Sequence, residues 1–199
     1  NVHLPNDPTR EKTGWSQDIQ NAFDATAYNF DAASMYQKWQ QDLLDIQYEN
    51  GYVPPVAPGR FDGHHINGPW WGGMIVYLPW KLYRYYNDQR MLQKSYPAMK
   101  KYVGYLDSIA DSNIVKWGLG DWREPGTHRP QNTPVNLTST VAYYNYAKIT
   151  AQTAAVLGKT DEARKYLQKS RKIKKAYNDY FYEPSSGTYA TGSQASQLL

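Results

Sequence analysis

Six segments of the chain repeat apolar side chains at intervals of three and four residues, and this periodicity constrains the fold more than any other feature. The segments cover approximately residues 18–28, 31–47, 69–86, 91–110, 138–157 and 160–181. No stretch longer than a few residues alternates apolar and polar side chains as a half-buried strand would. We therefore predict an all-α fold in which successive helices, joined by loops, form antiparallel pairs.

Residues at the ends of these segments indicate where the helices begin and end. Ser16 precedes the first segment, and Asp31 and Thr160 stand where N-cap residues of the second and sixth helices are expected. Gly158 is expected to close the fifth helix, and Pro79 to kink the third. Residues 194–199 indicate the start of a further helix. We therefore expect residues 1–199 to be one partial domain, cut at both ends from a longer chain.

Composition excludes several classes of function. The 199 residues include no cysteine, which rules out disulfides and thiolate metal sites, and the formal net charge is only +4. No run of eighteen apolar residues exists, so we predict no membrane span. The basic cluster at residues 169–175 is interpreted as a solvated helix face and not as a nucleic-acid site. His64 and His65 lack carboxylates at regular spacing, so we predict no metal site there.

The aromatic residues are of an unusual type, with 19 tyrosines and 7 tryptophans but only 4 phenylalanines. Tyrosine and tryptophan combine a flat apolar face with a hydrogen-bonding edge, which matches the apolar faces and hydroxyl rims of sugars. Most of the tyrosines are interpreted as packing between helices. The tryptophans in loops are different, because the loops at 48–68 and 114–135 are long, and long loops inside a domain are usually functional.

The segment from Asn6 to Asp18 has the highest density of polar and aromatic side chains. It holds three carboxylates, two cations and a tryptophan, and Pro8 and Gly14 favour a loop there. Hydrolysis of a glycosidic bond needs a protonated carboxylic acid beside the leaving oxygen, together with groups that bind sugar hydroxyls. A solvated turn that leads into an N-capped helix would have the same composition. The residues alone leave both interpretations open.

This segment resembles the signature of glycoside hydrolase family 78, the α-L-rhamnosidases. The residues that match the family pattern in order and spacing are Arg10, Glu11, Lys12, Gly14, Trp15 and Asp18. The resemblance continues through residues 28–31, 69–72 and 120–122, and it covers nearly the whole chain. Asn6 and Asp7 depart from the pattern, since they stand where the family has Asp and Cys. This departure bears on sugar specificity more than on reaction class.

The resemblance implies an (α/α) toroid of six helical hairpins, about half of it in this chain, and an inverting hydrolase that releases terminal α-L-rhamnose from rhamnosides such as glycans, pectic polysaccharide or plant glycosides. It implies no metal and no cofactor. Glu11 would be the general acid. The residues that would bind the sugar are Asn6, Asp7, Arg10, Trp15, Asp18, Trp71, Tyr77, Asp121 and Trp122. The general base would be a Glu beyond Leu199, so the rest of the catalytic domain would be this chain's partner.

Two alternatives remain at this point. Another toroidal glycosidase, such as a glucosidase or an unsaturated-glucuronyl hydrolase, would not carry the segment around Glu11 in this form. A non-catalytic carbohydrate-binding module would keep the tryptophans but would have no use for Glu11. Because plant and polysaccharide rhamnosides occur mostly outside the cytoplasm, we expect a secreted or periplasmic protein.

Overall fold

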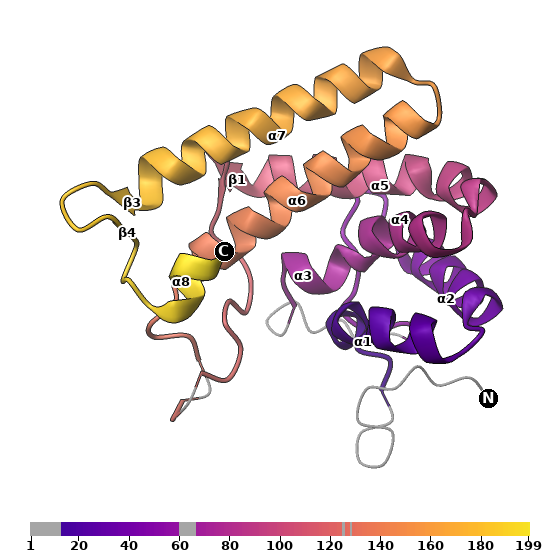
Figure 1. The fold of residues 1–199 in the computed structure, drawn as a ribbon, viewed down its shortest axis with the longest axis horizontal. Helices are drawn as coiled ribbons and strands as arrows, with labels where there is room; N and C mark the ends of the chain where they lie inside the picture. The colour runs from indigo at the N-terminus through magenta and orange to yellow at the C-terminus, as the bar shows by residue number, and fades with distance from the viewer. Residues whose placement is uncertain (1–12, 60–66, 125, 128) are drawn as a thin grey trace.

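The structure, a computed structural model, describes residues 13–59, 67–124, 126–127 and 129–199. Its helices are α1 (Ser16–Asn29), α2 (Ala33–Ile46), α3 (Pro69–Gly72), α4 (Met74–Tyr86), α5 (Gln89–Ile109), α6 (Val135–Val156), α7 (Thr160–Phe181) and α8 (Gln194–Leu198) (Figure 1). Its strands, two residues each, form two antiparallel hairpins: β1 (Ala110–Asp111) with β2 (Ile114–Val115), and β3 (Tyr182–Glu183) with β4 (Thr188–Tyr189). The all-α prediction is confirmed.

Alternate helices share a layer. Helix α1 contacts α4, and α4 contacts α6, while α4 and α6 each pack against the helix that follows them, α5 and α7. Figure 1 shows α7 returning along α6 in a long antiparallel pair. The helices α1, α4 and α6 therefore form one layer, which we call the inner layer, and α2, α5 and α7 flank it.

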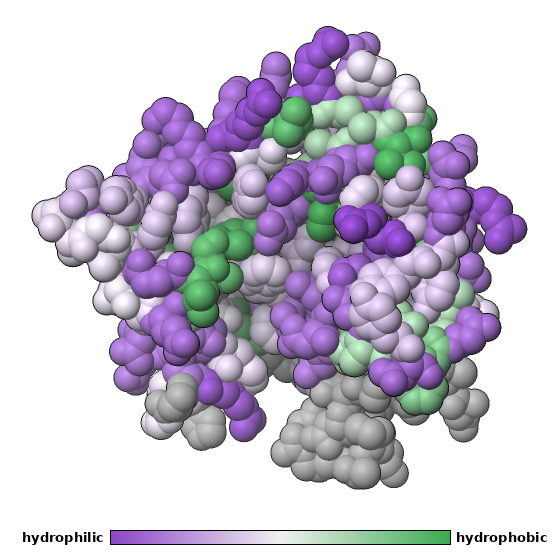
Figure 2. Space-filling model, in the orientation of Figure 1, coloured by the Kyte–Doolittle hydropathy of each residue, from purple (hydrophilic) through white to green (hydrophobic). Residues whose placement is uncertain are grey.

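The sequences of α6 and α7 explain their different layers. Every residue from 137 to 143 of α6 is buried, and a helix that is buried all round belongs inside a domain. In α7 the buried residues are Ser170, Ile173, Tyr177 and Phe181, which follow one face at helical spacing. Hydrophilic residues dominate the surface over α7 (Figure 2). Although α6 is apolar, none of the described helices is long and apolar enough to cross a membrane.

The helix predicted over 69–86 is two helices, α3 and α4, which meet at Gly72 and Gly73. A Cβ atom on Gly73 would lie 2.0 Å from the ring of Tyr146, and one on Gly72 would lie 2.8 Å from the ring of Tyr102. The Tyr102 hydroxyl also donates a hydrogen bond to the Pro69 carbonyl at 2.8 Å. Two tyrosines of the neighbouring helices therefore pack directly on this backbone, which periodicity alone did not reveal.

Helix α4 continues through Pro79, because a side chain replaces the missing backbone donor. Proline has no N–H for the carbonyl four residues earlier, which here belongs to Ile75. The fully buried Gln40 of α2 donates its Nε2 to that carbonyl at 3.2 Å, and the same nitrogen lies 3.2 Å from Ser95 Oγ of α5. One amide thus satisfies the freed carbonyl and links three helices.

Both predicted N-caps are wrong. The N-cap of α2 is Ala32, no side chain caps that end, and Asp31 lies one residue further out, exposed to solvent. Ala32 is only 3% exposed, so its burial in the core sets where the helix enters. Thr160 is the first residue of α7, and Lys159 takes the N-cap position without a side-chain hydrogen bond.

Other helix ends have clear local causes. Helix α5 begins two residues earlier than predicted, because Asp88 caps it and accepts a hydrogen bond from the Met91 N–H at 3.0 Å. Gly158 closes the fifth predicted helix as expected, with a φ of +72°. The Lys159 N–H then reaches back to the Ala154 carbonyl at 2.8 Å.

Candidate active site

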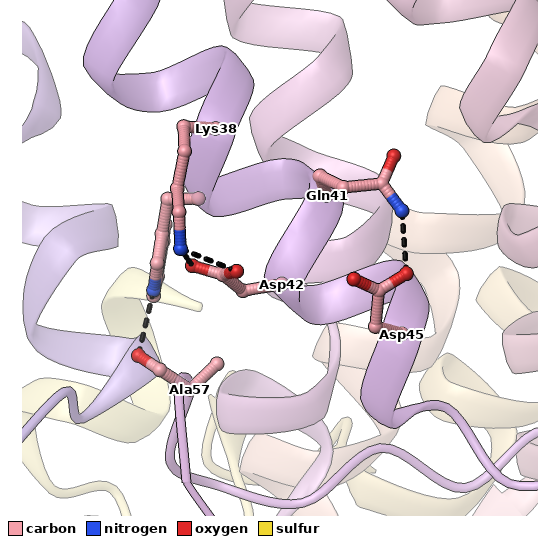
Figure 3. A network of polar contacts seen from close by, with 6 residues as sticks. Lys38, Gln41, Asp42, Asp45 and Ala57 are labelled. Carbon is pink, nitrogen blue, oxygen red and sulfur yellow. Dashed lines mark hydrogen bonds and ion pairs between the residues drawn. The ribbon is translucent and has the colours of Figure 1, made fainter.

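The residues that lead into α1 run antiparallel to part of the loop between α2 and α3. The Ser16 N–H donates to the Pro55 carbonyl at 2.9 Å, and the Ala57 N–H donates to the Gly14 carbonyl at 3.0 Å. A Cβ atom on Gly14 would lie 2.1 Å from the Ala57 carbonyl oxygen, so only glycine fits. That oxygen also accepts from Trp39 Nε1 of α2 at 2.7 Å (Figure 3). This pairing fixes the end of the segment in which sequence analysis placed the catalytic acid.

The buried Ser16 joins α1 to α3. Its Oγ lies 2.8 Å from the carbonyl oxygen of Trp71 and 3.0 Å from that of Pro55. The first turn of α1, with Asp18, therefore lies close to Trp71 although 53 positions separate them in the sequence.

The two long loops cross at Gly68 and Gly118. A Cβ atom on Gly68 would lie 3.1 Å from the Gly118 Cα, and one on Gly118 would lie 2.6 Å from Ser139 Oγ. Gly118 also has a φ of +145°, which favours glycine. The crossing brings Trp71, three residues after Gly68, next to the segment 119–123.

These contacts surround a cavity of about 1000 Å³, which is at the upper end of the range for small-molecule sites. Its walls come from the start of α1, from α3, from the loop 119–123, from Thr138 at the start of α6 and from α8. The flanking helices α2, α5 and α7 contribute no lining residue among those described. The predicted sugar-binding residues on its wall are Trp15, Asp18, Trp71, Asp121 and Trp122.

The side chains on the wall suit a carbohydrate. Trp122 is 41% exposed and Trp71 8%, so Trp122 leaves more of its indole ring open to solvent than Trp71 does. Asp18 and Asp121 add carboxylates, which accept hydrogen bonds from hydroxyls. Indole faces beside carboxylates can bind the apolar face and the hydroxyl rim of one sugar ring.

Sequence analysis did not assign several residues of the wall. Trp70 lies on it, and its Nε1 donates to the Thr138 carbonyl at 3.1 Å, which fixes the indole. The other unassigned residues with polar side chains are Gln17, Gln20, Asn21, Arg123 and Thr138. The polar residues on the first two turns of α1 could have indicated this in the sequence, because a helix of the inner layer would otherwise carry apolar side chains there.

A chain of hydroxyl groups connects Asp121 to α8. Thr133 Oγ1 lies 3.3 Å from Asp121 Oδ2 and 3.0 Å from Ser193 Oγ. Ser193 caps α8 by accepting a hydrogen bond from the Ser196 N–H at 3.2 Å. Helix α8 then places Leu198 on the cavity wall, where hydrophobic side chains interrupt the hydrophilic surface (Figure 2).

Glu124 closes the loop that carries Asp121 and Trp122. Its carboxylate accepts hydrogen bonds from the backbone N–H groups of Gln131, Asn132 and Thr133, each at 2.8 Å, and the residue is 5% exposed. These bonds, among which that from the Asn132 N–H lowers the pKa most, hold the pKa of Glu124 below its ordinary range. The ionised carboxylate of Glu124 therefore stabilises this loop by binding the backbone of residues 131–133. Sequence analysis did not assign this role to Glu124.

Among the described residues that were predicted to bind the sugar, Tyr77 is not on the wall of this cavity. Tyr77 lies on α4, with Lys81 Nζ 5.2 Å from its ring centroid, and burial raises its pKa. Its proposed contact with the sugar stays a prediction. Four predicted site residues lie outside the described part of the chain: Asn6, Asp7, Arg10 and Glu11. His64 and His65, for which no metal site was predicted, also lie outside it.

Comparison with known proteins gives consistent matches. Residues 3–199 match the sequence model of a family described as the bacterial alpha-L-rhamnosidase 6 hairpin glycosidase domain. An alpha-L-rhamnosidase of Formosa agariphila is 30% identical over 202 residues, which cover 98% of this chain and 22% of the relative.

Two solved structures share the fold. An alpha-L-rhamnosidase from Dictyoglumus thermophilum has a TM-score of 0.83 and 34% identity, over 88% of this chain and 20% of that one. An alpha-L-rhamnosidase from Streptomyces avermitilis, solved in complex with L-rhamnose, has a TM-score of 0.83 and 29% identity, over 94% of this chain and 17% of that one. The chain thus spans about a fifth of the length of the relatives that it matches.

Proposed function

The chain belongs to the bacterial α-L-rhamnosidase six-hairpin glycosidase domain family, and from that membership we propose that it takes part in the hydrolysis of terminal α-L-rhamnose from a rhamnoside, with inversion at the anomeric carbon. The observation that carries this proposal is the cavity: five residues assigned to the sugar from sequence line it together, from three separate segments. The L-rhamnose in the Streptomyces avermitilis relative supports the choice of sugar.

We assign the chemical roles as follows. The Glu11 carboxylic acid protonates the glycosidic oxygen while the bond from that oxygen to the anomeric carbon breaks. Water attacks the anomeric carbon from the opposite face, and a carboxylate base outside this chain takes its proton, as inversion requires. Asp18 and Arg10, with Asn6 or Asp7, bind ring hydroxyls.

The indoles of the cavity have a separate task in this scheme. Trp15, Trp71 and Trp122 pack against the apolar faces of the sugar and keep bulk water, other than the attacking molecule, away from the bond that breaks. We further propose a periplasmic or secreted location, where rhamnosides of plants and polysaccharides are met. Fractionation of cells and assay of rhamnosidase activity in each fraction tests that location.

The Glu11→Gln variant tests the assignment, and it is made in the full chain that carries these residues. Glutamine keeps the shape of the side chain but has no proton to give, so we expect kcat on a rhamnosyl disaccharide to fall by about 10²–10⁴-fold. The loss is smaller on an aryl rhamnoside, whose good leaving group needs less protonation.

A matched control is Glu49→Gln, which removes an exposed glutamate of the loop between α2 and α3 that is not on the cavity wall. Its kcat should equal that of the wild type. If Glu11→Gln hydrolyses the disaccharide at the wild-type rate, Glu11 is not the acid.

Nuclear magnetic resonance of the first product tests inversion, because an inverting enzyme releases β-L-rhamnose from an α-linked substrate.

A further inference from the structure

Asp121 lies on the cavity wall, and a single side chain holds its carboxylate. Thr133 Oγ1 donates a hydrogen bond to Asp121 Oδ2 at 3.3 Å. Among the residues that the structure describes, the Asp121 side chain forms no ion pair and no other hydrogen bond. The direction in which this carboxylate points therefore depends on one hydroxyl group.

Thr133 is itself fixed by its surroundings. It is 2% exposed, and its backbone N–H donates to Glu124 Oε1 at 2.8 Å. The next residue, Pro134, is the N-cap of α6, so Thr133 is joined directly to the inner layer. Thr133 does not line the cavity. Its hydroxyl can therefore act on a bound sugar only through another group, and Asp121 is its hydrogen-bond partner on the cavity wall.

The hydroxyl groups behind Thr133 donate in one direction, towards Asp121. The Thr133 hydroxyl has one hydrogen and an ionised carboxylate can only accept, so that hydrogen belongs to the bond with Asp121. Ser193 Oγ, 3.0 Å from Thr133 Oγ1, is then the donor to Thr133, and Ser196 Oγ, 2.8 Å from Ser193 Oγ, donates in turn. Each bond in such a chain polarises the next, which strengthens the last donor.

We propose that Thr133 is a positioning residue for the substrate. Its hydroxyl holds Asp121 Oδ2, so that the other carboxylate oxygen, Oδ1, faces the cavity and accepts a hydrogen bond from a hydroxyl of the sugar. The proposal rests on the proposed function, because it concerns how Asp121 binds the sugar of the same rhamnoside. It adds a residue that acts from behind the cavity wall and that sequence analysis gave no role.

The test compares Thr133→Val, Thr133→Ser and wild type in the full chain, by kcat/KM on an aryl rhamnoside at a temperature below the Tm of every variant. Valine keeps the shape of threonine without the hydroxyl. We expect Thr133→Val to lower kcat/KM by about 5- to 10-fold, the effect of one ordinary hydrogen bond, because 3.3 Å is long for a hydroxyl donor. Thr133→Ser keeps the hydroxyl and should recover most of this loss.

The same substitution in an Asp121→Ala background distinguishes positioning from a general effect on the fold. Without the carboxylate there is nothing for the hydroxyl to orient, so Thr133→Val should then change kcat/KM no further. The matched control is Thr127→Val, which also removes a hydroxyl of this loop. Thr127 Oγ1 donates to the Arg129 carbonyl at 3.0 Å and does not line the cavity, so this variant should keep the wild-type kcat/KM.

Three results would overturn the proposal: a wild-type kcat/KM in Thr133→Val, no recovery in Thr133→Ser, or the same fold-loss from Thr133→Val with and without Asp121. Each of them leaves the proposed function intact, because the wild-type chain still hydrolyses the aryl rhamnoside. If the wild-type full chain hydrolyses no rhamnoside, the proposed function is wrong and the positioning role is refuted with it.

Discussion

Replacing Gly14 with alanine tests whether backbone pairing positions the catalytic segment. The new Cβ would lie 2.1 Å from the Ala57 carbonyl oxygen, more than 1 Å closer than the ordinary van der Waals contact of 3.4 Å. The obstacle is backbone and not a flexible side chain, so the two chains must separate. Gly14→Ala therefore acts on the geometry of the site without changing any group that contacts substrate.

The structure indicates how large the effect should be. Separation weakens the hydrogen bond between Ala57 and Gly14, the bond between Ser16 and Pro55, and the bond from Trp39 to the Ala57 carbonyl. Each contributes about 1 kcal/mol, so we expect a loss of about 2–3 kcal/mol in the free energy of unfolding. That loss lowers the Tm by about 4–12 °C for a domain of this size. A displacement of about 1 Å also lowers kcat/KM by about 10²-fold.

Gly104→Ala is the matched control, because Gly104 lies inside α5 and, apart from its chain neighbours and the backbone of its own helix, no described atom lies within 4 Å of the new Cβ. Alanine is the better helix former by about 0.5–1 kcal/mol, so this variant should be slightly more stable than the wild type and equally active. Thermal unfolding and steady-state kinetics on an aryl rhamnoside measure both effects. If Gly14→Ala matches the wild type in Tm and in kcat/KM, the pairing does not position the segment and the reasoning fails.

Two further predictions concern buried polar groups. The backbone N–H groups that lower the pKa of Glu124 make its ionised form stabilising above its ordinary pKa, and this stability is lost as the pH falls through the folded pKa. Glu124→Gln should therefore lower the Tm at neutral pH, and the difference in Tm from the wild type should be smaller at acidic pH. An equal difference in Tm at neutral and at acidic pH would contradict the role of Glu124 in stabilising the loop. Gln40→Leu leaves the Ile75 carbonyl buried without a donor and should cost about 1–3 kcal/mol in denaturant unfolding. In a Pro79→Ala background, which returns a backbone N–H to that carbonyl, the cost should be smaller, and strict additivity of the two changes would refute this account.

The sequence predicted the helices well and their ends less well, for a physical reason. Helix position follows from an apolar stripe that must be buried, and this stripe is visible in the sequence at three- and four-residue spacing. The positions of helix ends depend on which neighbouring group forms hydrogen bonds with the unpaired backbone N–H and C=O groups there. Asp31 has the right chemistry for a cap, yet burial of Ala32 sets the entry of α2, and burial depends on contacts distant in sequence.

Among the residues of the candidate site, too, some were predicted from the sequence and others were not. Trp15, Asp18, Trp71, Asp121 and Trp122 line the cavity, and they were identified through the resemblance to the family, since their chemistry alone left a solvated turn equally open. Glu124 and Trp70 were not identified, because their partners are backbone atoms: the N–H groups of residues 131–133 and the Thr138 carbonyl. A backbone group has no signature in the sequence, so a residue that binds one cannot be distinguished from a solvated residue until the fold is known.

The direction of the inner helices gives the cavity a further electrostatic property. Each antiparallel pair returns the chain to the same end, so α1, α3 and α6 all begin at the cavity, and α8 begins beside it (Figure 1). The N-terminal end of a helix carries a partial positive charge, which favours negative groups in its first turn. Asp18 occupies the first turn of the fourteen-residue α1, so its negative charge and the partial charge of that helix end attract one another.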